Sequence, residues 1–331
     1  MTEKRLSLDG ASVLVTGGTG SFGQAFIQRL FAAHRPARVI VYSRDELKQY
    51  EMQQRFPQDE VRFFIGDVRD LDRLKMALNG VEFVVHAAAL KQVPAAEYNP
   101  IECIKTNIIG AENVINACIE RGVTKVIALS TDKAVSPINL YGATKLCADK
   151  LFIAANHLSG REGTRFAVVR YGNVIGSRGS VVPFFKERGK TGKLPVTDRR
   201  MTRFWIRLEE GAKFVERSLG LMHGGEVFVP KIPSMRITDL ATAICADCEH
   251  EIVGIRPGEK LHEMLITRDD AINTLEFDDY FVIQPAIRYW QNSEITNYGG
   301  VQGRRVTEDF EYTSNTNDRW LDAAGLRAAI E

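Results

Sequence analysis

The residues with the clearest capacity for chemistry lie in the run STDKAVSPINLYGATK, from Ser130 to Lys145. Within it, Tyr141 and Lys145 are one helical turn apart, so both side chains project from one face of a helix. A nearby ammonium favours tyrosinate and lowers the pKa of the tyrosine. A tyrosine tuned in this way can take a proton from a hydroxyl group while hydride leaves the same carbon. The pair therefore predicts oxidation of an alcohol by a nicotinamide.

Thr131, Asp132 and Lys133 precede this pair and extend the chemistry that it can support. Thr131 can hydrogen-bond the oxygen that the tyrosine deprotonates. Oxidation of a sugar at C4 makes the C5 proton acidic, and Lys133 would remove that proton if its pKa is lowered. Asp132 would help the C6 hydroxyl leave if burial keeps the carboxyl protonated. Hydride returned to C6 would complete a loss of water with no net redox change.

Asp132 and Lys133 are adjacent, and successive side chains of a regular strand point to opposite faces. Both residues can reach one site only if the backbone here is irregular. The turn formers Ser136, Pro137 and Asn139 favour such a loop. The alternatives are one catalytic residue with a solvated partner, or a surface ion pair.

The elements that must position these residues alternate between short apolar runs and helical patterns. The apolar runs are nearly continuous in hydrophobicity, as strands buried on both faces should be. We expect strands at residues 12–16, 38–42, 61–65, 83–86, 125–129 and 166–170, and helices at 23–33, 44–56, 70–79, 100–121 and 140–159. This order predicts an α/β fold with a doubly wound, Rossmann-type parallel sheet. Ligands of such sheets bind at the carboxyl ends of the strands.

After residue 170 the pattern is looser, and turn-forming glycines and prolines are frequent between 176 and 200. A helix is expected at 208–222, a strand at 226–229 and a further helix from about Thr238, whereas the tail beyond Asp269 has no clear period. We therefore predict two regions. A nucleotide-binding domain comprises 1–175, joined by 200–230, and a smaller C-terminal substrate-binding region comprises 176–199 and 231–331.

A glycine-rich turn, TGGTGSFG, follows the first expected strand and opens the first expected helix. Gly17, Gly20 and Gly23 permit a tight turn and let backbone N–H groups approach a pyrophosphate at the helix N-terminus. The strand–turn–helix context separates this motif from an ordinary glycine-rich turn. It predicts a dinucleotide site that also includes Thr19, Ser21 and Phe22.

The end of the second expected strand indicates which dinucleotide binds. An NAD site usually offers a carboxylate to the ribose hydroxyls at this point. Here the strand ends in Ser43 and Arg44, and Lys48 follows one turn later on the same helical face. A hydroxyl and two cations suit a 2′-phosphate, so NADP is predicted. NAD is the alternative if Asp45 faces the ribose, and the two cations can also form a solvated helix face.

Two other strand ends give weaker signals for the same cofactor. Asp67 and Val68 follow the third expected strand, where they would hold the adenine. Ala87 is the first of three alanines after the fourth, where small side chains let the backbone approach the cofactor. Small residues after strands are common, so these assignments depend on the glycine turn.

The 331-residue chain has 44% hydrophobic and 26% charged residues and a net charge of +1. This is the composition of a soluble globular protein with no electrostatic bias toward nucleic acid or membrane. No apolar run approaches the roughly 20 residues of a membrane span, and the polar N-terminus lacks the apolar core of a signal peptide. A cytoplasmic location is therefore expected.

The five cysteines are scattered and odd in number, which argues against a disulfide framework. Cys245 and Cys248 have redox or zinc spacing, but no second Cys or His pair stands at finger spacing. We interpret them as ordinary buried or half-buried thiols on a helix. No metal site is predicted.

Six blocks occur in order over about residues 8–267: TGGTGSFG, ALKQVPAAEYNP, STDKAVSPINLYGATK, MTRFWIRLEEG, GEVFVPKIPSMRITDL and GIRPGEKLHEM. Together they resemble the inverting UDP-N-acetylglucosamine 4,6-dehydratases, which are extended short-chain dehydrogenase/reductase enzymes. The resemblance implies tightly held NADP, UDP-N-acetylglucosamine as substrate, and loss of water with inversion at C5. The implied product, UDP-2-acetamido-2,6-dideoxy-beta-L-arabino-hex-4-ulose, starts pseudaminic acid synthesis. A homo-oligomer, a hexamer, is implied in the same way and not by the residues themselves.

The resemblance also implies roles for individual residues. Lys133 would be the C5 base and Asp132 the acid, whereas retaining 4,6-dehydratases carry Glu after the Asp. Tyr141 with Lys145 would carry out C4 oxidation. Arg256 would clamp the diphosphate through bidentate bonds, although it can also be a solvated charge beside a turn. The remaining residues near cofactor or substrate would be Lys91, Asn173, Val174, Arg178, Gly179, Ser180, Val181, Val182, Thr197, Met201 and Glu259.

Three other functions remain open from the sequence. The chain could be a UDP-sugar 4-epimerase, which needs the Tyr–Lys pair but no C5 base. It could be an inverting dehydratase and epimerase that feeds L-fucosamine-type sugars. It could also be a non-catalytic regulator that binds NADP or a nucleotide sugar.

Overall fold

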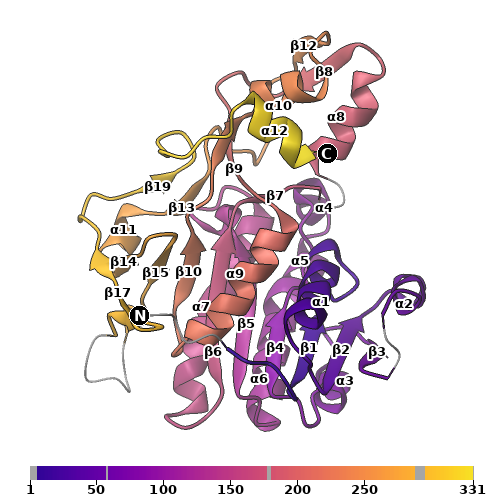
Figure 1. Ribbon diagram of the computed structural model, residues 1–331, viewed down its shortest axis with the longest axis vertical. Coiled ribbons are helices and arrows are strands. Elements are labelled where there is room, and N and C mark those ends of the chain that lie inside the picture. Colours follow the sequence, from indigo (N-terminus) through magenta and orange to yellow (C-terminus); the bar gives the residue numbers. More distant parts are fainter. Residues whose placement is uncertain (1–5, 57–58, 177–179, 288–294, 331) are drawn as a thin grey trace.

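The computed structural model describes residues 6–56, 59–176, 180–287 and 295–330. Its centre is a ten-stranded sheet in the order β18-β14-β15-β10-β6-β5-β4-β1-β2-β3 (Figure 1). The strands from β10 to β3 in this order run parallel. They are β1 (Ser12–Thr16), β2 (Arg38–Ser43), β3 (Val61–Ile65), β4 (Phe83–His86), β5 (Lys125–Thr131), β6 (Arg165–Tyr171) and β10 (Val227–Pro230). The predicted doubly wound parallel sheet is confirmed.

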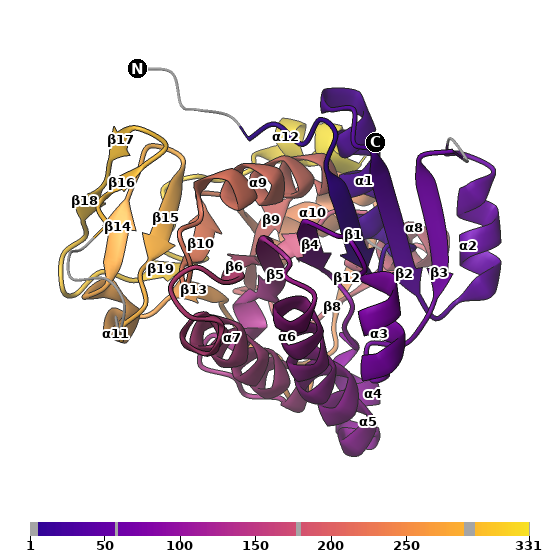
Figure 2. The ribbon, with the colours of Figure 1, turned by 90° about the horizontal axis from the view of Figure 1, so that it is seen from below.

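Helices cover both faces of this sheet (Figure 2). On one face, α1 packs against α9, and on the other α6 packs against α3 and α7. No helix in the described ranges is both long and apolar enough to cross a membrane. The bounds are α1 (Ser21–Ala33), α2 (Glu46–Gln53), α3 (Leu71–Ala77), α6 (Gly110–Glu120), α7 (Leu140–Ser159) and α9 (Leu208–Leu221).

The helix expected at 100–121 is interrupted. It consists of α5 (Pro100–Ile104), a π-helical turn (Lys105–Ile109) and α6, and the short α4 (Val93–Tyr98) precedes it. Asn107 in the π turn accepts a hydrogen bond from the Leu90 amide at 2.8 Å and donates one to the Leu90 carbonyl at 2.9 Å. The π turn thus aims one side chain at the loop after β4, which belongs to the ligand end of the sheet.

The tail extends the central sheet instead of lying wholly outside it. β14 (Thr274–Glu276), β15 (Tyr280–Ile283) and β18 (Arg304–Arg305) join beyond β10, and all their pairings are antiparallel. The prediction assigned all of 231–331 to the substrate-binding region, and these three strands of that range lie in the central sheet. These strands were hard to predict from the sequence, because antiparallel edge strands this short show little hydrophobic periodicity. The smaller tail elements are α11 (Arg268–Ala271), β16 (Asn297–Tyr298) and β17 (Val301–Gln302).

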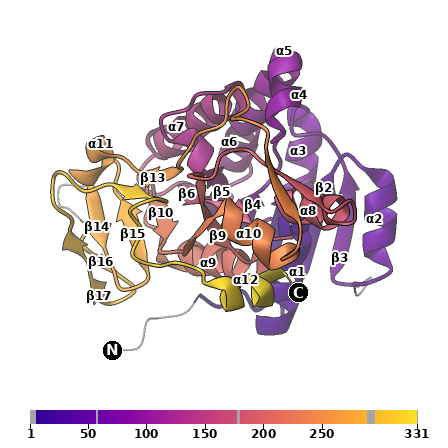
Figure 3. The ribbon, with the colours of Figure 1, turned by 90° about the horizontal axis from the view of Figure 1, so that it is seen from above.

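A second, smaller layer lies over the carboxyl ends of the parallel strands (Figures 1 and 3). It has its own apolar cluster, which includes Leu194, Trp205, Leu240 and Leu326. The C-terminal helix α12 (Ala323–Ile330) packs on α10 (Ile237–Ile244), so the end of the chain closes this layer. Its other elements are β7 (Asn173–Val174), α8 (Val181–Gly189), β8 (Lys193–Val196), β9 (Thr202–Ile206), β11 (Ser234–Arg236) and β12 (Glu249–Ile252). β13 (Met264–Ile266) and β19 (Tyr312–Thr313) pair beside it.

The prediction of ordinary thiols at Cys245 and Cys248 is wrong. The two residues form a disulfide, with their Cα atoms 5.4 Å apart. α10 ends at Ile244, and the backbone of Cys245 is extended, so the helix that the prediction assumed does not continue through the pair. The bridge closes the turn between α10 and β12. The Cys248 Sγ lies 3.4 Å from the Gly189 carbonyl, at the end of α8.

Candidate active site

A cavity of about 1030 Å³ opens where the carboxyl ends of β1, β2, β4, β5 and β6 face the second layer. Most of the residues predicted from the sequence line it. They are Gly17, Thr19, Gly20, Ser21, Phe22, Gly23, Ser43, Arg44, Lys48, Asp67, Val68, Ala87, Lys91, Thr131, Lys133, Tyr141, Lys145, Asn173, Val174, Ser180, Val181, Thr197, Met201, Arg256 and Glu259.

Two predicted residues, Asp132 and Val182, do not belong to this lining. Asp132 is fully buried directly behind it. Val182 is only 5% exposed and packs in the apolar cluster of the second layer instead of lining the cavity. Val181 and Pro183, its neighbours in the first turn of α8, line the cavity. Arg178 and Gly179 lie outside the described residues.

The glycine turn is shaped as a cradle for a phosphate group. Gly17 has φ +64°, and a Cβ added there would lie 2.9 Å from the Ala88 amide nitrogen. A Cβ at Gly23 would lie 2.5 Å from the Gly18 backbone. Only glycine fits at either place, and Gly20 follows as the N-cap of α1. The N-terminus of α1 is therefore accessible to an anion in the way that dinucleotide folds require.

The two charged residues that follow β2, Arg44 and Asp45, differ in how they are engaged. Asp45 is the N-cap of α2: its carboxylate accepts a hydrogen bond from the Lys48 amide at 3.0 Å and pairs with the Lys48 ammonium. Arg44 keeps 53% of its side chain exposed, and its nearest acid is Asp67, at 3.6 Å. Ser43 Oγ accepts a hydrogen bond from Thr19 Oγ1 at 3.1 Å, which joins this end to the glycine turn.

The backbone after β5 has the irregularity that the sequence required. Asp132–Ala134 form one 3₁₀ turn, and Ser136 has a positive φ of 42°. The turn brings the Lys133 Nζ to 3.0 Å from Asp132 Oδ1, and Thr131 Oγ1 donates to the same oxygen at 2.9 Å. The side chains of Asp132 and Lys133 would point to opposite faces on a regular strand, whereas in this turn they meet at Asp132 Oδ1.

The pKa of Tyr141 departs from the prediction. Burial raises it to about 12, and the charge of Lys133, rather than that of Lys145, is the largest opposing influence. Burial also lowers the pKa of Lys145, against the opposing charge of Asp149. The predicted lowering of the tyrosine pKa by Lys145 is therefore not seen, because desolvation of the phenolate outweighs the charges around it.

Asp132 and Lys133 differ in how well they fit their predicted roles. Burial raises the pKa of the Asp132 carboxyl, and the charge of Glu263 raises it further, which suits a group kept protonated. Burial alone would lower the pKa of Lys133, but the charges of Asp132 and Glu263 raise it above its usual value. The lowered pKa expected for a base at Lys133 is thus contradicted, and its ammonium is the favoured form beside two carboxylates.

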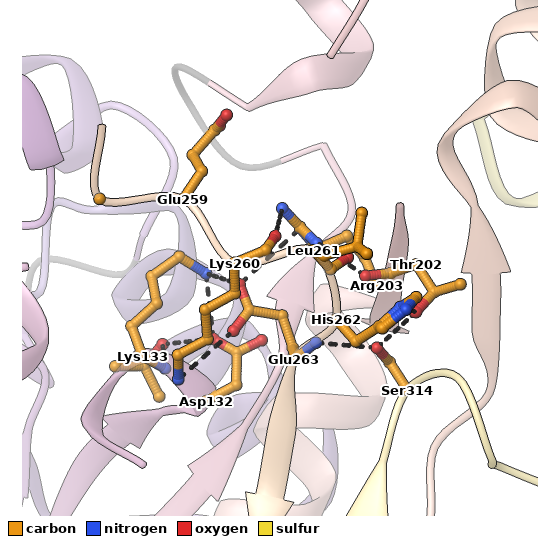
Figure 4. Close-up of polar contacts among 12 residues, drawn as sticks. Asp132, Lys133, Thr202, Arg203, Glu259, Lys260, Leu261, His262, Glu263 and Ser314 are labelled. Atoms are coloured by element: carbon orange, nitrogen blue, oxygen red, sulfur yellow. Dashed lines mark hydrogen bonds and ion pairs between the residues drawn. The ribbon is translucent and has the colours of Figure 1, made fainter. Parts of the chain in front are cut away.

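Glu263 is the residue that sequence reasoning missed. It precedes β13, is 2% exposed, and its Oε1 lies 3.3 Å from the Lys133 Nζ (Figure 4). Arg203 from β9 and Lys260 from the preceding loop also pair with its carboxylate. The only available signal was the block GIRPGEKLHEM, which holds two glutamates without indicating which one is buried. Figure 4 shows Glu259 pointing away from this cluster.

Comparison with known proteins agrees with this arrangement. Residues 13–285 match the family described as "Polysaccharide biosynthesis protein". A protein of Campylobacter jejuni subsp. jejuni serotype O:23/36 (strain 81-176), named UDP-N-acetylglucosamine 4,6-dehydratase (inverting), is 57% identical over 96% of each chain. A protein of Rickettsia conorii named UDP-glucose 4-epimerase is 42% identical over 82% of each chain.

Solved structures share the fold over most or nearly all of this chain. The chain described as "X-ray structure of Pen from Bacillus thuringiensis" is 35% identical, with a TM-score of 0.88 and 98% of each chain covered. The dTDP-glucose 4,6-dehydratase DesIV from Streptomyces venezuelae, with a TM-score of 0.67 and 22% identity, shares the fold over 76% of this chain. The predicted resemblance is confirmed: the chain belongs to the polysaccharide biosynthesis protein family and is an enzyme related to the inverting UDP-N-acetylglucosamine 4,6-dehydratases.

Proposed function

We propose that this enzyme removes water from UDP-N-acetylglucosamine with inversion at C5, using NADP. The product would be UDP-2-acetamido-2,6-dideoxy-beta-L-arabino-hex-4-ulose. The observation that carries the proposal is that Lys133, which lines the same cavity as Tyr141, lies 3.0 Å from the buried Asp132. An acid and an amine at this position serve no purpose in a simple alcohol oxidation, and elimination of water needs both.

Tyr141 and Thr131 act at the C4 oxygen. Bound nicotinamide would accept hydride from C4 and later return it to C6. Tyr141 takes the proton of the C4 hydroxyl, and Thr131 holds that oxygen by a hydrogen bond. The charge of Lys133 stabilises the tyrosinate, since Lys133 is the strongest cationic influence on Tyr141. Lys145, one turn further along α7, lines the same cavity.

Lys133 and Asp132 act at C5 and C6. Transfer of one proton from Lys133 Nζ to Asp132 Oδ1, across 3.0 Å, breaks an N–H bond and forms an O–H bond. It leaves a neutral amine and a neutral carboxylic acid. The amine then removes the C5 proton, and the acid protonates the departing C6 hydroxyl. The raised pKa of Asp132 favours this proton transfer, because a buried carboxylate is protonated more readily than an exposed one.

The test is the product of the purified enzyme with UDP-N-acetylglucosamine in heavy water. We expect a product lighter than the substrate by one water, apart from the deuterium gained, with deuterium at C5 and the inverted configuration there by NMR. A solvent-derived hydrogen at C5 is expected because the proton is removed by a side chain that exchanges with water. A product of unchanged mass would refute dehydration.

NADP is proposed over NAD because Asp45 is engaged in capping α2 while Arg44 lines the cavity. Arg44→Ala should weaken NADP binding by about 10-fold or more, since a hydrogen bond to a charged group is worth about 1.5–3 kcal/mol. NAD binding should stay the same, because NAD has no 2′-phosphate. Calorimetric titration with NADP and with NAD gives the two dissociation constants for the parent enzyme and for the variant. Arg69→Ala is the control, because Arg69 also pairs with Asp67 but does not line the cavity.

A 4-epimerase is the second candidate, and the 42% identical relative that carries this name favours it. An epimerase would use Tyr141 and Lys145 and would leave the substrate mass unchanged, so the same experiment separates the two. A related dehydratase of an L-fucosamine-type pathway would be separated by the configuration of its product. Residues 176–199 and the non-sheet parts of 231–331 are proposed to bind the sugar nucleotide. The hexamer, the cytoplasmic location and entry of the product into pseudaminic acid synthesis stay predictions.

A further inference from the structure

Lys133 is held from two directions by carboxylates that come from distant parts of the chain. Asp132 Oδ1 lies 3.0 Å from its Nζ and Glu263 Oε1 lies 3.3 Å from it. Asp132 is fully buried and Glu263 is 2% exposed, while Lys133 keeps 25% of its side chain exposed toward the cavity. Lys133 is therefore the partly exposed member of a buried charge cluster.

Glu263 is itself rigidly placed. Its amide donates to Ser314 Oγ at 2.9 Å, and Ser314 is hydrogen-bonded to Thr202 Oγ1 at 2.7 Å. Its carboxylate is 3.7 Å from the Arg203 Nε and 4.0 Å from the Lys260 Nζ. The Arg203 guanidinium is fixed in turn by the backbone carbonyls of residues 202, 260 and 261, at 2.7, 2.9 and 3.1 Å. Figure 4 shows these groups converging on Glu263 from β9, the 259–262 segment and Ser314.

We propose that Glu263 is a positioning residue for the dehydration: its carboxylate, anchored by Arg203, holds the Lys133 Nζ beside Asp132 at the edge of the catalytic cavity. The inference deepens the proposed function and rests on it. A lysine side chain has a flexible stem, so its amine needs a second fixed partner to stay in one place. Asp132 alone cannot serve, since it has to give up its charge when it becomes the acid.

Glu263 also sets the protonation of Lys133. The charged and titratable groups that face Lys133 are Asp132, Glu263, Arg203, Lys91 and Lys260, with Tyr141 from α7. Despite its burial, the pKa of Glu263 is lowered by Lys133, Arg203 and Lys260, so Glu263 stays ionised and does not take the lysine proton. Asp132, whose pKa is raised, is left as the acceptor. Glu263 stays charged and Asp132 accepts the proton because more cations lie beside Glu263 than beside Asp132.

The first test uses Glu263→Gln, which removes the charge and keeps the shape. We expect kcat for water loss to fall by about 10-fold to 100-fold, the scale for a misplaced catalytic group, with KM unchanged. Both limbs of the pH profile of kcat should move to lower pH, because the working Asp132–Lys133 pair holds one transferable proton and Glu263 raises the pKa of both members. A merely structural role would lower the active fraction and leave the pH profile in place.

Glu263→Asp separates position from charge. It keeps the carboxylate but withdraws it by one methylene, so kcat should fall while the pH profile stays near that of the parent enzyme. Glu226→Gln is the matched control for loss of a buried carboxylate: Glu226 is 1% exposed, accepts from two backbone amides at 2.8 Å and lies outside the cavity lining. It should alter neither kcat nor the profile. If Glu263→Gln does not fold, Glu263→Asp still tests the position.

A second readout does not depend on the reaction. Acetylation of Lys133 by acetic anhydride in the cofactor-bound enzyme can be followed across pH by peptide mass spectrometry, with exposed Lys213 as internal reference. Lys133 should become reactive at lower pH in Glu263→Gln than in the parent or in Glu263→Asp. An active parent enzyme with unchanged kcat, pH profile and labelling in Glu263→Gln would overturn the inference. If the parent does not release water from UDP-N-acetylglucosamine, the proposed function fails, whereas the labelling still tests the Lys133–Glu263 contact.

Discussion

Lys133→Ala is expected to abolish water loss while cofactor binding persists and C4 oxidation continues at a lower rate, because Tyr141 loses the cation that most favours its tyrosinate. General acid–base groups typically contribute about 10²–10⁴-fold, and this residue supplies the only amine placed beside Asp132 in the described structure. Without it, the C5 proton has no acceptor, so hydride transferred from C4 remains on the nicotinamide. Rapid mixing with UDP-N-acetylglucosamine should show a rise in reduced-nicotinamide absorbance that does not decay, and mass spectrometry should find no dehydrated sugar.

The variant also leaves two buried carboxylates without their shared ammonium. Glu263 retains Arg203 and Lys260, whereas Asp132 is left with Thr131 and should become protonated. Lys133→Met, which fills the same space without charge, should stop the reaction at the same stage. Lys150→Ala, at an exposed position of α7 outside the cavity, is the control and should turn over normally. Water loss at the parent rate in Lys133→Ala would remove Lys133 as the base.

Tyr141→Phe should stop the reaction one step earlier, before any hydride leaves C4. The substitution removes only the hydroxyl, and the ring remains packed with Ala96 and Cys103. No other group in the described part of the cavity combines a phenol with the neighbouring Thr131 and Lys133, so we expect a loss of about 10²–10⁴-fold. The nicotinamide absorbance should stay constant on mixing, and recovered substrate should carry no deuterium at C5.

The contrast between the two variants is the sharpest available check on the order of steps. Lys133→Ala should accumulate reduced cofactor and Tyr141→Phe should not, although both release no product. Tyr298→Phe is the matched control, since Tyr298 is a buried tyrosine whose hydroxyl lies 3.4 Å from Glu226, away from the cavity. Accumulation of reduced cofactor in Tyr141→Phe would mean that another group takes the C4 proton.

Much of the nucleotide-binding half could be predicted because its signals are local. β1, β3 and β4 begin and end where the apolar runs do, and α7 spans the expected residues. The tail could not be assigned in the same way. β14, β15 and β18 are short and are held by antiparallel pairing to strands far away in the chain, so their position depends on contacts that no local pattern reports.

The Cys245–Cys248 pair shows a related limit. Its spacing is compatible with thiols on a helix, with a metal site and with a bridge. The structure has a bridge because α10 ends at Ile244, and the chain then turns so that the two sulfurs come together. Helix ends are among the features that sequence patterns locate least well.

At the site, the sequence by itself determined which groups are present and which neighbours share a face: the glycine cradle, the Tyr141–Lys145 turn, and an acid and an amine after β5. Their charges were decided only by the tertiary structure. Tyr141 and Lys133 both have raised pKa values where lowered ones were expected, through burial of the phenol and through the charges of Asp132 and Glu263 beside the amine. Residue type and spacing are properties of the chain, whereas desolvation and Coulomb energies depend on distances that exist only once β13 has been brought against the turn after β5.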